Sequence, residues 1–199
     1  MKISALPRQN EHPARERILM TAHALFYRDG IRATGIDRVI AESSVAKVTF
    51  YRHFPSKNDL IRAYMEYRHQ HWMAWFNAAL ERHGVGRGRG IDALRPVLDE
   101  WFTDEGFRGC AFINSVGELG SALPEVKETT RRHKRGMVAA IALLLPPSRQ
   151  RGRIAEAVAL AVDGAIVHAQ FDDTPTSALN ALGRILKALQ AEMSSSTEA

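Results

Sequence analysis

The chain is poor in cysteine: Cys110 is the only one among its 199 residues. An intrachain disulfide is therefore excluded, and a single thiol fits a reducing compartment. Long apolar runs are also absent, because the longest uncharged one, residues 137–145, is far short of the roughly 20 residues that cross a bilayer. Residues 1–17 contain no apolar signal core. These absences predict a cytoplasmic protein without a membrane partner.

Strand signals are missing as well. No stretch of useful length alternates apolar and polar residues with a period of two, and no internal repeat is visible. Apolar residues recur at helical spacing instead. The glycine-rich segment 84–90 follows no strand, so we predict a flexible joint there rather than a nucleotide-binding loop. The sequence predicts an all-α fold with helices over residues 13–29, 34–43, 46–53, 56–83, 91–103, 111–119, 124–145, 150–170 and 176–193.

The positive charge is distributed unevenly. Residues 1–57 contain ten Lys and Arg against five Asp and Glu, whereas residues 58–199 contain seventeen of each sign. The whole basic excess therefore lies in the first quarter of the chain, which should meet an anionic partner. A basic surface binds nucleic acid, anionic lipid or an acidic protein, or is simply solvated, so charge alone does not choose among these.

Residues 47–60, KVTFYRHFPSKNDL, combine basic, hydroxyl and aromatic side chains. They follow a short helix after a tight turn, and the exposed face of the second helix of such a pair fits the DNA major groove. The side chains expected to anchor this helix inward are Val45, Val48 or Phe50, and Phe54. The side chains expected to face phosphates and base edges are Lys47, Thr49, Tyr51, Arg52 and His53. Lys57 begins the next helix, whose positive N-terminus suits a phosphate. A solvated rim is the weaker interpretation, because this cluster coincides with the basic quarter.

The stretch TGIDRVIAESSVAKVTFYRHFPSKNDLIRAYM resembles the DNA-binding segment of the TetR (tetracycline-repressor-like) family of bacterial transcriptional regulators. The similarity covers about residues 13–65. It implies a three-helix helix-turn-helix DNA-binding domain over residues 1–57, with the start of the fourth helix, and a helical effector-binding and dimerisation domain over residues 58–199. By this resemblance the residues that touch DNA are Thr34, Lys47, Thr49, Tyr51, Arg52, His53 and Lys57.

Further expectations follow from the same resemblance. They are a homodimer that binds a palindromic double-stranded DNA operator, acts as a repressor, and is released by a small-molecule effector. One position departs from the family pattern, because Ser44 stands in the turn where the family usually has Gly. If that turn needs a positive φ, serine costs on the order of 1 kcal/mol there.

An apolar stripe on the long fourth helix offers a candidate effector pocket. Such a stripe forms protein core more often than a pocket, but the resemblance implies apolar or aromatic effectors between helices four to eight. The candidate pocket residues are Met65, Trp72, Trp75, Phe76, Phe102, Asn114, Glu118 and His168. The last three are the polar groups expected to orient the ligand.

The last two helices are apolar on nearly every side, so they need cover on every side. The centre of a monomer core would supply it, but in a chain with this many other predicted helices a partner subunit is the better source of cover, with a two-fold dimer as the default symmetry. We expect a dimer interface formed by Val158, Ala161, Ala165, Leu179, Leu182, Ile185 and Leu186.

Cys110 and the histidines of the long fourth helix suggest three other functions. A redox-responsive regulator that senses through Cys110 is the alternative among binding proteins, and a Cys-dependent enzyme on a helical scaffold is the alternative from another class. No motif marks a base or an oxyanion hole for such an enzyme, so we expect none. Glu66 and His69 can share a helix face while His71 lies on another, and two ligands make no convincing metal site. We therefore expect neither a metal nor a cofactor.

Overall fold

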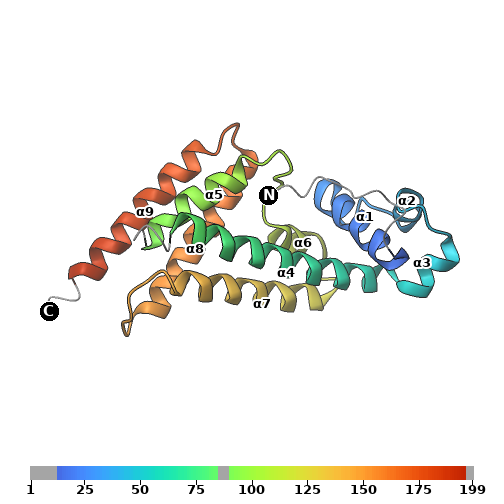
Figure 1. Cartoon of the computed structure of the whole chain (residues 1–199), viewed down its shortest axis with the longest axis horizontal. Coiled ribbons are helices and arrows are strands. Elements are labelled where there is room, and N and C mark those ends of the chain that lie inside the picture. Colours follow the sequence, from blue (N-terminus) through green and yellow to red (C-terminus); the bar gives the residue numbers. More distant parts are fainter. Residues whose placement is uncertain (1–12, 85–89, 196–199) are drawn as a thin grey trace. The chain divides into compact units, whose positions relative to one another are not determined.

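The computed structural model describes residues 13–84 and 90–195 (Figure 1), so most of the predicted joint at 84–90 lies outside the described residues. The described residues form helices without any strand, which confirms the all-α prediction. The helices are α1 (Ala14–Asp29), α2 (Ile36–Glu42), α3 (Lys47–His53), α4 (Lys57–His83), the 3-10 helix η2 (Gly90–Ala93), α5 (Leu94–Phe102), α6 (Ala111–Leu119), α7 (Pro124–Ala142), α8 (Arg151–Phe171) and α9 (Thr176–Ser195).

The described chain packs into two compact units that are not continuous in sequence. The N-terminal unit comprises residues 13–71 and 111–132, and the C-terminal unit comprises residues 72–110 and 133–195. Helices α4 and α7 each contribute one part to both units. By packing, α6 and the start of α7 therefore belong with the helix-turn-helix, although they follow it by more than fifty residues.

The N-terminal unit forms around one face of α1. Its buried positions recur at helical spacing, so that a single apolar stripe faces α2, α3 and the start of α4. Tyr64 on α4 contacts Phe26 on α1 edge to face, with ring centroids 5.4 Å apart. The main apolar residues of this core are Ile18, Ala22, Leu25, Phe26, Val39, Phe50, Phe54, Leu60 and Tyr64.

Helix α4 begins at Lys57, one residue after the predicted start at residue 56. The Asp59 backbone N–H donates to Ser56 Oγ over 3.2 Å, and the Ser56 hydroxyl donates to Asp59 Oδ2 over 2.6 Å. Pro55 prevents α3 from continuing into this cap, because the residue before proline is disfavoured in a helix. The short second helix of the pair is therefore held between a turn and a fixed helix start.

The C-terminal unit is built on long helices. Helices α8 and α9 pack against each other, and α9 also packs on η2 and α5. Helix α7 ends at Ala142 rather than at the expected residue 145, because Leu144 and Leu145 donate to carbonyls three residues back and so tighten the chain before two prolines. Aromatic side chains of α4 and α5 fill much of the interior.

Candidate nucleic-acid interface

Helix α3 presents one polar face to solvent. Lys47, Val48, Tyr51 and Arg52 are exposed, and their spacing places them on one side of the helix. Phe50 and Phe54 are buried on the opposite side, whereas Thr49 and His53 are half-buried. The exposed set suits a groove reader, since it combines cations, a hydroxyl and an apolar methyl pair.

Val48 is the residue of this face that the sequence did not single out. The sequence allowed either Val48 or Phe50 to anchor α3, and the structure buries Phe50 completely while 67% of Val48 is exposed. The larger aromatic wins because it fills the space against α1 and contacts Phe54 with ring centroids 6.2 Å apart. Val48 is left to offer its methyl groups outward, where a thymine methyl is the matching base feature.

The turn between α2 and α3 contains a serine with a positive φ, which is unfavourable for a residue with a Cβ. Ser44 has a φ of 52°, in the left-handed region. The turn therefore does need a positive φ at the position where this chain has serine instead of the family's usual glycine. The side chain of the preceding Ser43 is buried and donates to the Ile40 carbonyl over 3.2 Å. The Arg17 guanidinium on α1 donates to the carbonyls of Ser43 and Ser44. These contacts hold a turn whose backbone strain is about 1 kcal/mol.

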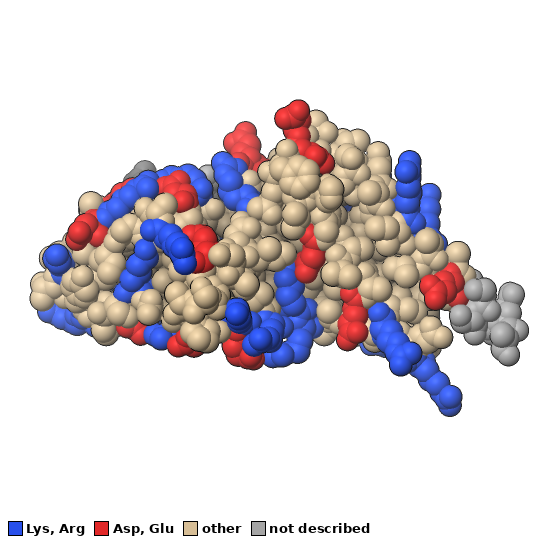
Figure 2. Space-filling view, turned by 180° about the vertical axis from the view of Figure 1, so that it is seen from behind, with Lys and Arg blue, Asp and Glu red and all other residues tan. Residues whose placement is uncertain are grey.

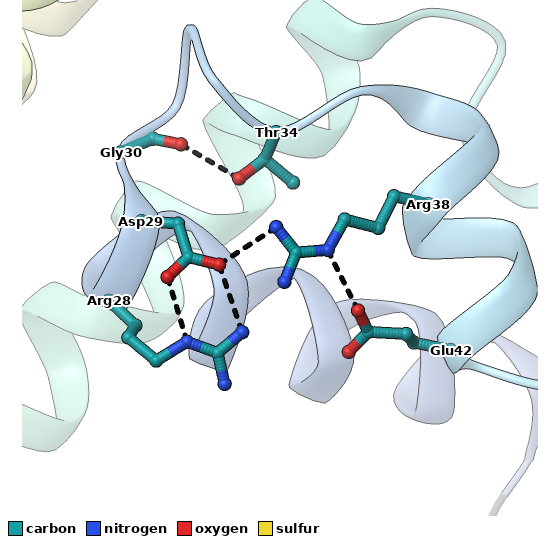
Figure 3. Close-up of polar contacts among 6 residues, drawn as sticks. All are labelled: Arg28, Asp29, Gly30, Thr34, Arg38 and Glu42. Carbon is teal, nitrogen blue, oxygen red and sulfur yellow. Dashed lines mark hydrogen bonds and ion pairs between the residues drawn. The ribbon is translucent and has the colours of Figure 1, made fainter.

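Thr34 does not face solvent, which corrects its assignment as a DNA contact. Its side chain is fully buried, and its hydroxyl donates to the Gly30 carbonyl over 2.8 Å (Figure 3). Helix α2 begins at Ile36, two residues after the predicted start at residue 34. The hydroxyl closes the loop after α1, a contact that no local sequence pattern reveals.

Several arginines near the helix-turn-helix are held by acidic neighbours. Arg28 donates to both oxygens of Asp29, and Arg38 bridges Asp29 to Glu42 at 2.9 Å and 2.8 Å (Figure 3). The hydrogen bond from Arg28 holds the pKa of Asp29 low, at about 2. Figure 2 shows the same mixture more widely, with blue and red side chains intermingled over the face drawn.

The two cations of α3 are held less firmly than Arg28 and Arg38. Lys47 lies 3.7 Å from Asp37, a long and exposed contact that provides little energy. Arg52 has no ion pair among the residues that the structure describes. Lys47 and Arg52 are therefore the two charges of α3 that remain available to an anionic partner.

Lys57 and Glu118 meet at the loop between α1 and α2. The Lys57 ammonium donates to the Ile31 carbonyl over 2.7 Å, and burial lowers its pKa. Glu118, from α6, accepts a hydrogen bond from the Arg32 backbone N–H over 2.8 Å. Its carboxylate lies so close to Gly30 that a Cβ there would approach an oxygen to 3.3 Å. Glu118 therefore clamps this loop, and this corrects its assignment as an effector-pocket residue.

The aromatic residues of the candidate pocket do come together in the C-terminal unit. Trp72 stacks on Phe76 with ring centroids 4.7 Å apart, and it meets Trp101 of α5 edge to face at 5.5 Å. The indole nitrogen of Trp72 is buried and has no hydrogen-bond partner among the residues that the structure describes. Trp75 is half-buried beside Trp72, and its own indole donates to Glu100 over 3.2 Å.

The remaining predicted pocket residues are dispersed. Met65 is buried and Asn114 half-buried, and both belong to the N-terminal unit. Phe102 is buried on α5 next to Trp101, at 6.0 Å between ring centroids. His168 is exposed on α8 and packs on Phe171, so it orients nothing in the aromatic cluster. Helical spacing could not separate His168 from the inward side of α8, because small apolar residues surround that helix.

A cavity of about 490 Å³ in the C-terminal unit involves none of the predicted pocket residues. Its walls come from α4, α7 and the start of α8, and they are mostly apolar. Asn77 and Arg151 are the polar side chains that line it. No sequence pattern marks this cavity, since its walls are mainly small residues at ordinary helical positions. The lining residues are Met73, Asn77, Gly136, Ala139, Ala140, Ala142, Leu143 and Arg151.

The expected dimer residues are mostly covered by the chain itself. Five of the seven are buried in a single chain, which corrects their assignment to a surface: Val158, Ala165, Leu179, Leu182 and Leu186. Ala161 is half-buried and 45% of Ile185 is exposed. Other apolar side chains of α8 are more exposed, namely 74% of Leu160, 66% of Phe171 and 39% of Val167.

Helix α8 is thus apolar on its outer side as well. Within the described part of the chain it is long and apolar enough to cross a membrane by length and composition alone, a test that core helices of soluble proteins also pass. A third of the tested window is buried inside the molecule. In the same described part, no three His, Cys, Asp or Glu side chains gather as metal ligands do.

The comparisons with known proteins agree with this geometry. Residues 18–64, which run from α1 into α4, match the family described as bacterial regulatory proteins, tetR family. The chain is 22% identical to the HTH-type transcriptional repressor NemR of Escherichia coli K12 over 147 residues, 72% of each chain.

Solved structures share the fold over nearly the whole chain. A TetR-family transcriptional regulator from Streptomyces coelicolor superposes with a TM-score of 0.78 and 27% identity, over 90% of this chain and 95% of that one. The reduced form of Escherichia coli NemR gives a TM-score of 0.71 and 20% identity, over 87% and 95%. The helix-turn-helix with its exposed α3, the match over residues 18–64 and the shared all-helical fold together identify the chain as a member of the TetR family of DNA-binding transcriptional regulators.

Proposed function

We propose that this regulator is a homodimeric repressor that binds a palindromic DNA operator through α3 and leaves it when a small apolar or aromatic effector binds. The observation that carries the DNA part is the exposed face of Lys47, Val48, Tyr51 and Arg52 on the second helix of the helix-turn-helix. We place the DNA-reading function in residues 1–57, the effector and dimer functions in residues 58–199, and the protein in the cytoplasm.

The side chains of α3 divide into those proposed to contact bases and those proposed to contact phosphates. Lys47 lies in the first turn, and the first residues of a recognition helix are those that contact base edges in the major groove. Tyr51 and Thr49 are assigned to phosphates, together with Lys57 and the half-buried His53. Phosphate contacts position the protein without reading sequence, whereas a base contact discriminates by about 1–3 kcal/mol.

The experiment is a selection of operator sequence followed by titration of single variants. Lys47→Ala should relax base preference at one position of each half-site, and Tyr51→Phe should weaken binding to all duplexes alike. Arg153→Ala is the matched control, because Arg153 is an exposed cation of α8. If Lys47→Ala and Arg153→Ala behave identically on the selected operator, α3 is not the reading helix.

The dimer proposal rests on the uncovered apolar side chains of the last two helices. Leu160, Gly164, Val167 and Phe171 are exposed and recur every three or four residues along α8, so they form one stripe. A stripe of this kind on a soluble protein marks an interaction surface. A two-fold dimer covers it with its own copy and presents two α3 helices to successive major grooves, about 34 Å apart.

The effector proposal is supported by the aromatic cluster of the C-terminal unit. Trp72 offers a buried indole N–H without an acceptor beside the ring of Phe76. A flat ligand with a hydrogen-bond acceptor would satisfy this donor, since an apolar pocket needs a few polar groups to orient its ligand. Effector binding would favour the conformation that fits DNA less well.

A second candidate function, redox sensing, is favoured by the surroundings of Cys110. The thiol is buried, and the Lys134 ammonium lies 3.6 Å from its sulfur while it also pairs with Asp163. A sulfur beside a cation is the setting of reactive cysteines. Cys110→Ser distinguishes the two candidates: a redox regulator loses its oxidant response and retains operator binding, whereas an effector-gated repressor retains both operator binding and effector release.

A further inference from the structure

Arg68 is a buried cation of the N-terminal unit, and no carboxylate of the described residues pairs with it. It lies on α4 with 1% of its surface exposed, and it forms no ion pair among the described residues. Buried charges in proteins are normally paired, because transfer of an unpaired ion from water costs several kcal/mol. The position of Arg68 therefore needs an explanation beyond packing.

Two of the surfaces of its guanidinium are occupied by uncharged groups. Its Nη1 lies 3.2 Å from His23 Nε2, which must accept because a guanidinium only donates. Its plane lies over the ring of Tyr27, with the central carbon 3.8 Å from the ring centroid. Burial and then the charge of Arg68 lower the pKa of His23 to about 3, so the imidazole stays neutral at ordinary pH. Neither contact brings a negative charge.

The remaining edge of the guanidinium carries Nε and Nη2. Neither nitrogen has a hydrogen-bond partner among the described residues. Their N–H bonds point to the same side of the planar group, and two parallel donors of this kind bind both oxygens of one carboxylate. A single-charged, planar oxyanion would satisfy both donors and neutralise the cation at once.

We propose that Arg68 is the anchor of a carboxylate-binding site between α1 and α4, and that the ligand is an aromatic or otherwise hydrophobic carboxylic acid. The aromatic surroundings favour this class over phosphate. Tyr67 meets His23 edge to face at 5.0 Å and Tyr64 lies 5.9 Å from it, so the groups around the guanidinium are aromatic. A doubly charged, strongly hydrated phosphate would lose more solvation here than one guanidinium returns.

Entry requires movement of side chains rather than of helices. Tyr27 and Tyr67 are half-buried at the border of the site, whereas Tyr64 is fully buried. A ligand would reach the free edge of Arg68 only after one of these half-buried tyrosines turns away. No residue of this site belongs to the aromatic cluster of the C-terminal unit, and the inference depends on neither repression nor the proposed effector.

The first experiment is a calorimetric titration of the whole protein with benzoate and phenylacetate, with benzamide and inorganic phosphate as controls. We expect saturable binding of at least one acid, and none of benzamide, which keeps the ring but lacks the charge. Arg68→Met should weaken the binding at least about tenfold, because the two charge-assisted hydrogen bonds disappear. Arg62→Met is the matched control, since Arg62 is an exposed arginine of the same helix, and it should bind as wild type.

The second experiment is thermal unfolding without ligand, which separates a ligand site from a structural role. Arg68→Met should unfold at a higher temperature than wild type, because an unpaired buried charge is replaced by an apolar chain of similar length. The acid that binds should raise the unfolding temperature of wild type but not that of Arg68→Met. The proposal is overturned if neither acid binds, if Arg68→Met binds as wild type does, if phosphate binds as well as the acids, or if Arg68→Met unfolds at a lower temperature.

Discussion

The two compact units bury their apolar side chains in different ways. In the N-terminal unit, short helices are fixed by polar contacts at their ends, such as the Arg17 bonds to the turn and the Thr34 bond to Gly30. In the C-terminal unit, helices of 21 and 20 residues pack along apolar stripes and leave Leu160 and Phe171 exposed. The N-terminal unit is held by contacts within itself, whereas the C-terminal unit leaves an apolar surface that a second chain would cover.

The contrast explains what each unit can do. A recognition helix of seven residues must be held rigidly, because its contacts to bases depend on the exact placement of a few side chains. A dimer surface and an effector pocket tolerate more variation, since apolar contacts are non-directional. Substitutions in the two units test this contrast.

The largest effect should come from the two sides of the α8–α9 pair. Leu182→Ala removes a fully buried side chain and should lower the free energy of unfolding by about 3 kcal/mol. Leu160→Ala, on the exposed stripe, should change the stability of the monomer by less than about 0.5 kcal/mol and weaken self-association. Denaturant unfolding measures the first and sedimentation equilibrium the second.

Comparing the Leu160→Ala and Leu182→Ala variants tests whether the stripe is surface or core. If Leu160→Ala costs as much stability as Leu182→Ala, the stripe belongs to the core of the chain. If it leaves self-association unchanged, the dimer lies elsewhere on the molecule.

The next effect concerns acid stability of the N-terminal unit. His23 has a pKa of about 3 in the folded state, below the ordinary 6.5 that it regains on unfolding. The unfolded chain therefore binds a proton between these values that the folded chain does not, so stability is full above pH 6.5 and falls as the pH falls toward 3. Between pH 7.5 and 5 this histidine should cost about 2 kcal/mol.

The measurement is the free energy of unfolding across that pH range for wild type and His23→Gln. Glutamine retains an acceptor for Arg68 but does not titrate, so the variant should lose this part of the pH dependence. Equal slopes in the two proteins would show that the imidazole is protonated in the fold or unchanged on unfolding.

Much of the N-terminal unit could be predicted from the sequence, because its residues carry distinct chemistry. The predicted helix over residues 56–83 matches α4, and the basic and aromatic cluster at residues 47–60 includes α3. What failed there, at Thr34 and Glu118, failed because a polar side chain can serve a loop as readily as a ligand. The contact from Glu118 to Arg32 joins residues 86 apart in sequence, which no local pattern reveals.

The C-terminal unit was harder for a physical reason. The predicted bounds of its helices lie close to those in the structure. Leu182 and Leu160, however, are the same residue type on neighbouring apolar helices. Only packing decides which one faces the core. The cavity near Asn77 depends on how helices meet in space and leaves no periodic signal, and the same holds in the N-terminal unit for the unpaired edge of Arg68.

A smaller effect tests the coupling between α6 and the helix-turn-helix. Glu118→Ala removes the acceptor of the Arg32 N–H, and the loop between α1 and α2 should loosen at a cost of about 1.5 kcal/mol. We expect faster amide exchange at Arg32 and weaker operator binding. Glu128→Ala is the control, because Glu128 is an exposed glutamate of the same unit, on α7. Unchanged exchange at Arg32 would mean that this contact does not hold the loop.

The smallest expected effect comes from the turn itself. Ser44 holds a φ of 52°, which glycine adopts without the penalty of a Cβ, so Ser44→Gly should relieve strain. The gain is limited to at most about 1 kcal/mol, because glycine also gives the unfolded chain more freedom. Denaturant unfolding measures it, and Gly35→Ala serves as a comparison, since a Cβ at Gly35 meets no atom within 4 Å and its φ is negative. A loss of stability in Ser44→Gly would show that the serine contributes more through its contacts than its backbone conformation costs, and that the polar fixing of the N-terminal unit extends into the turn.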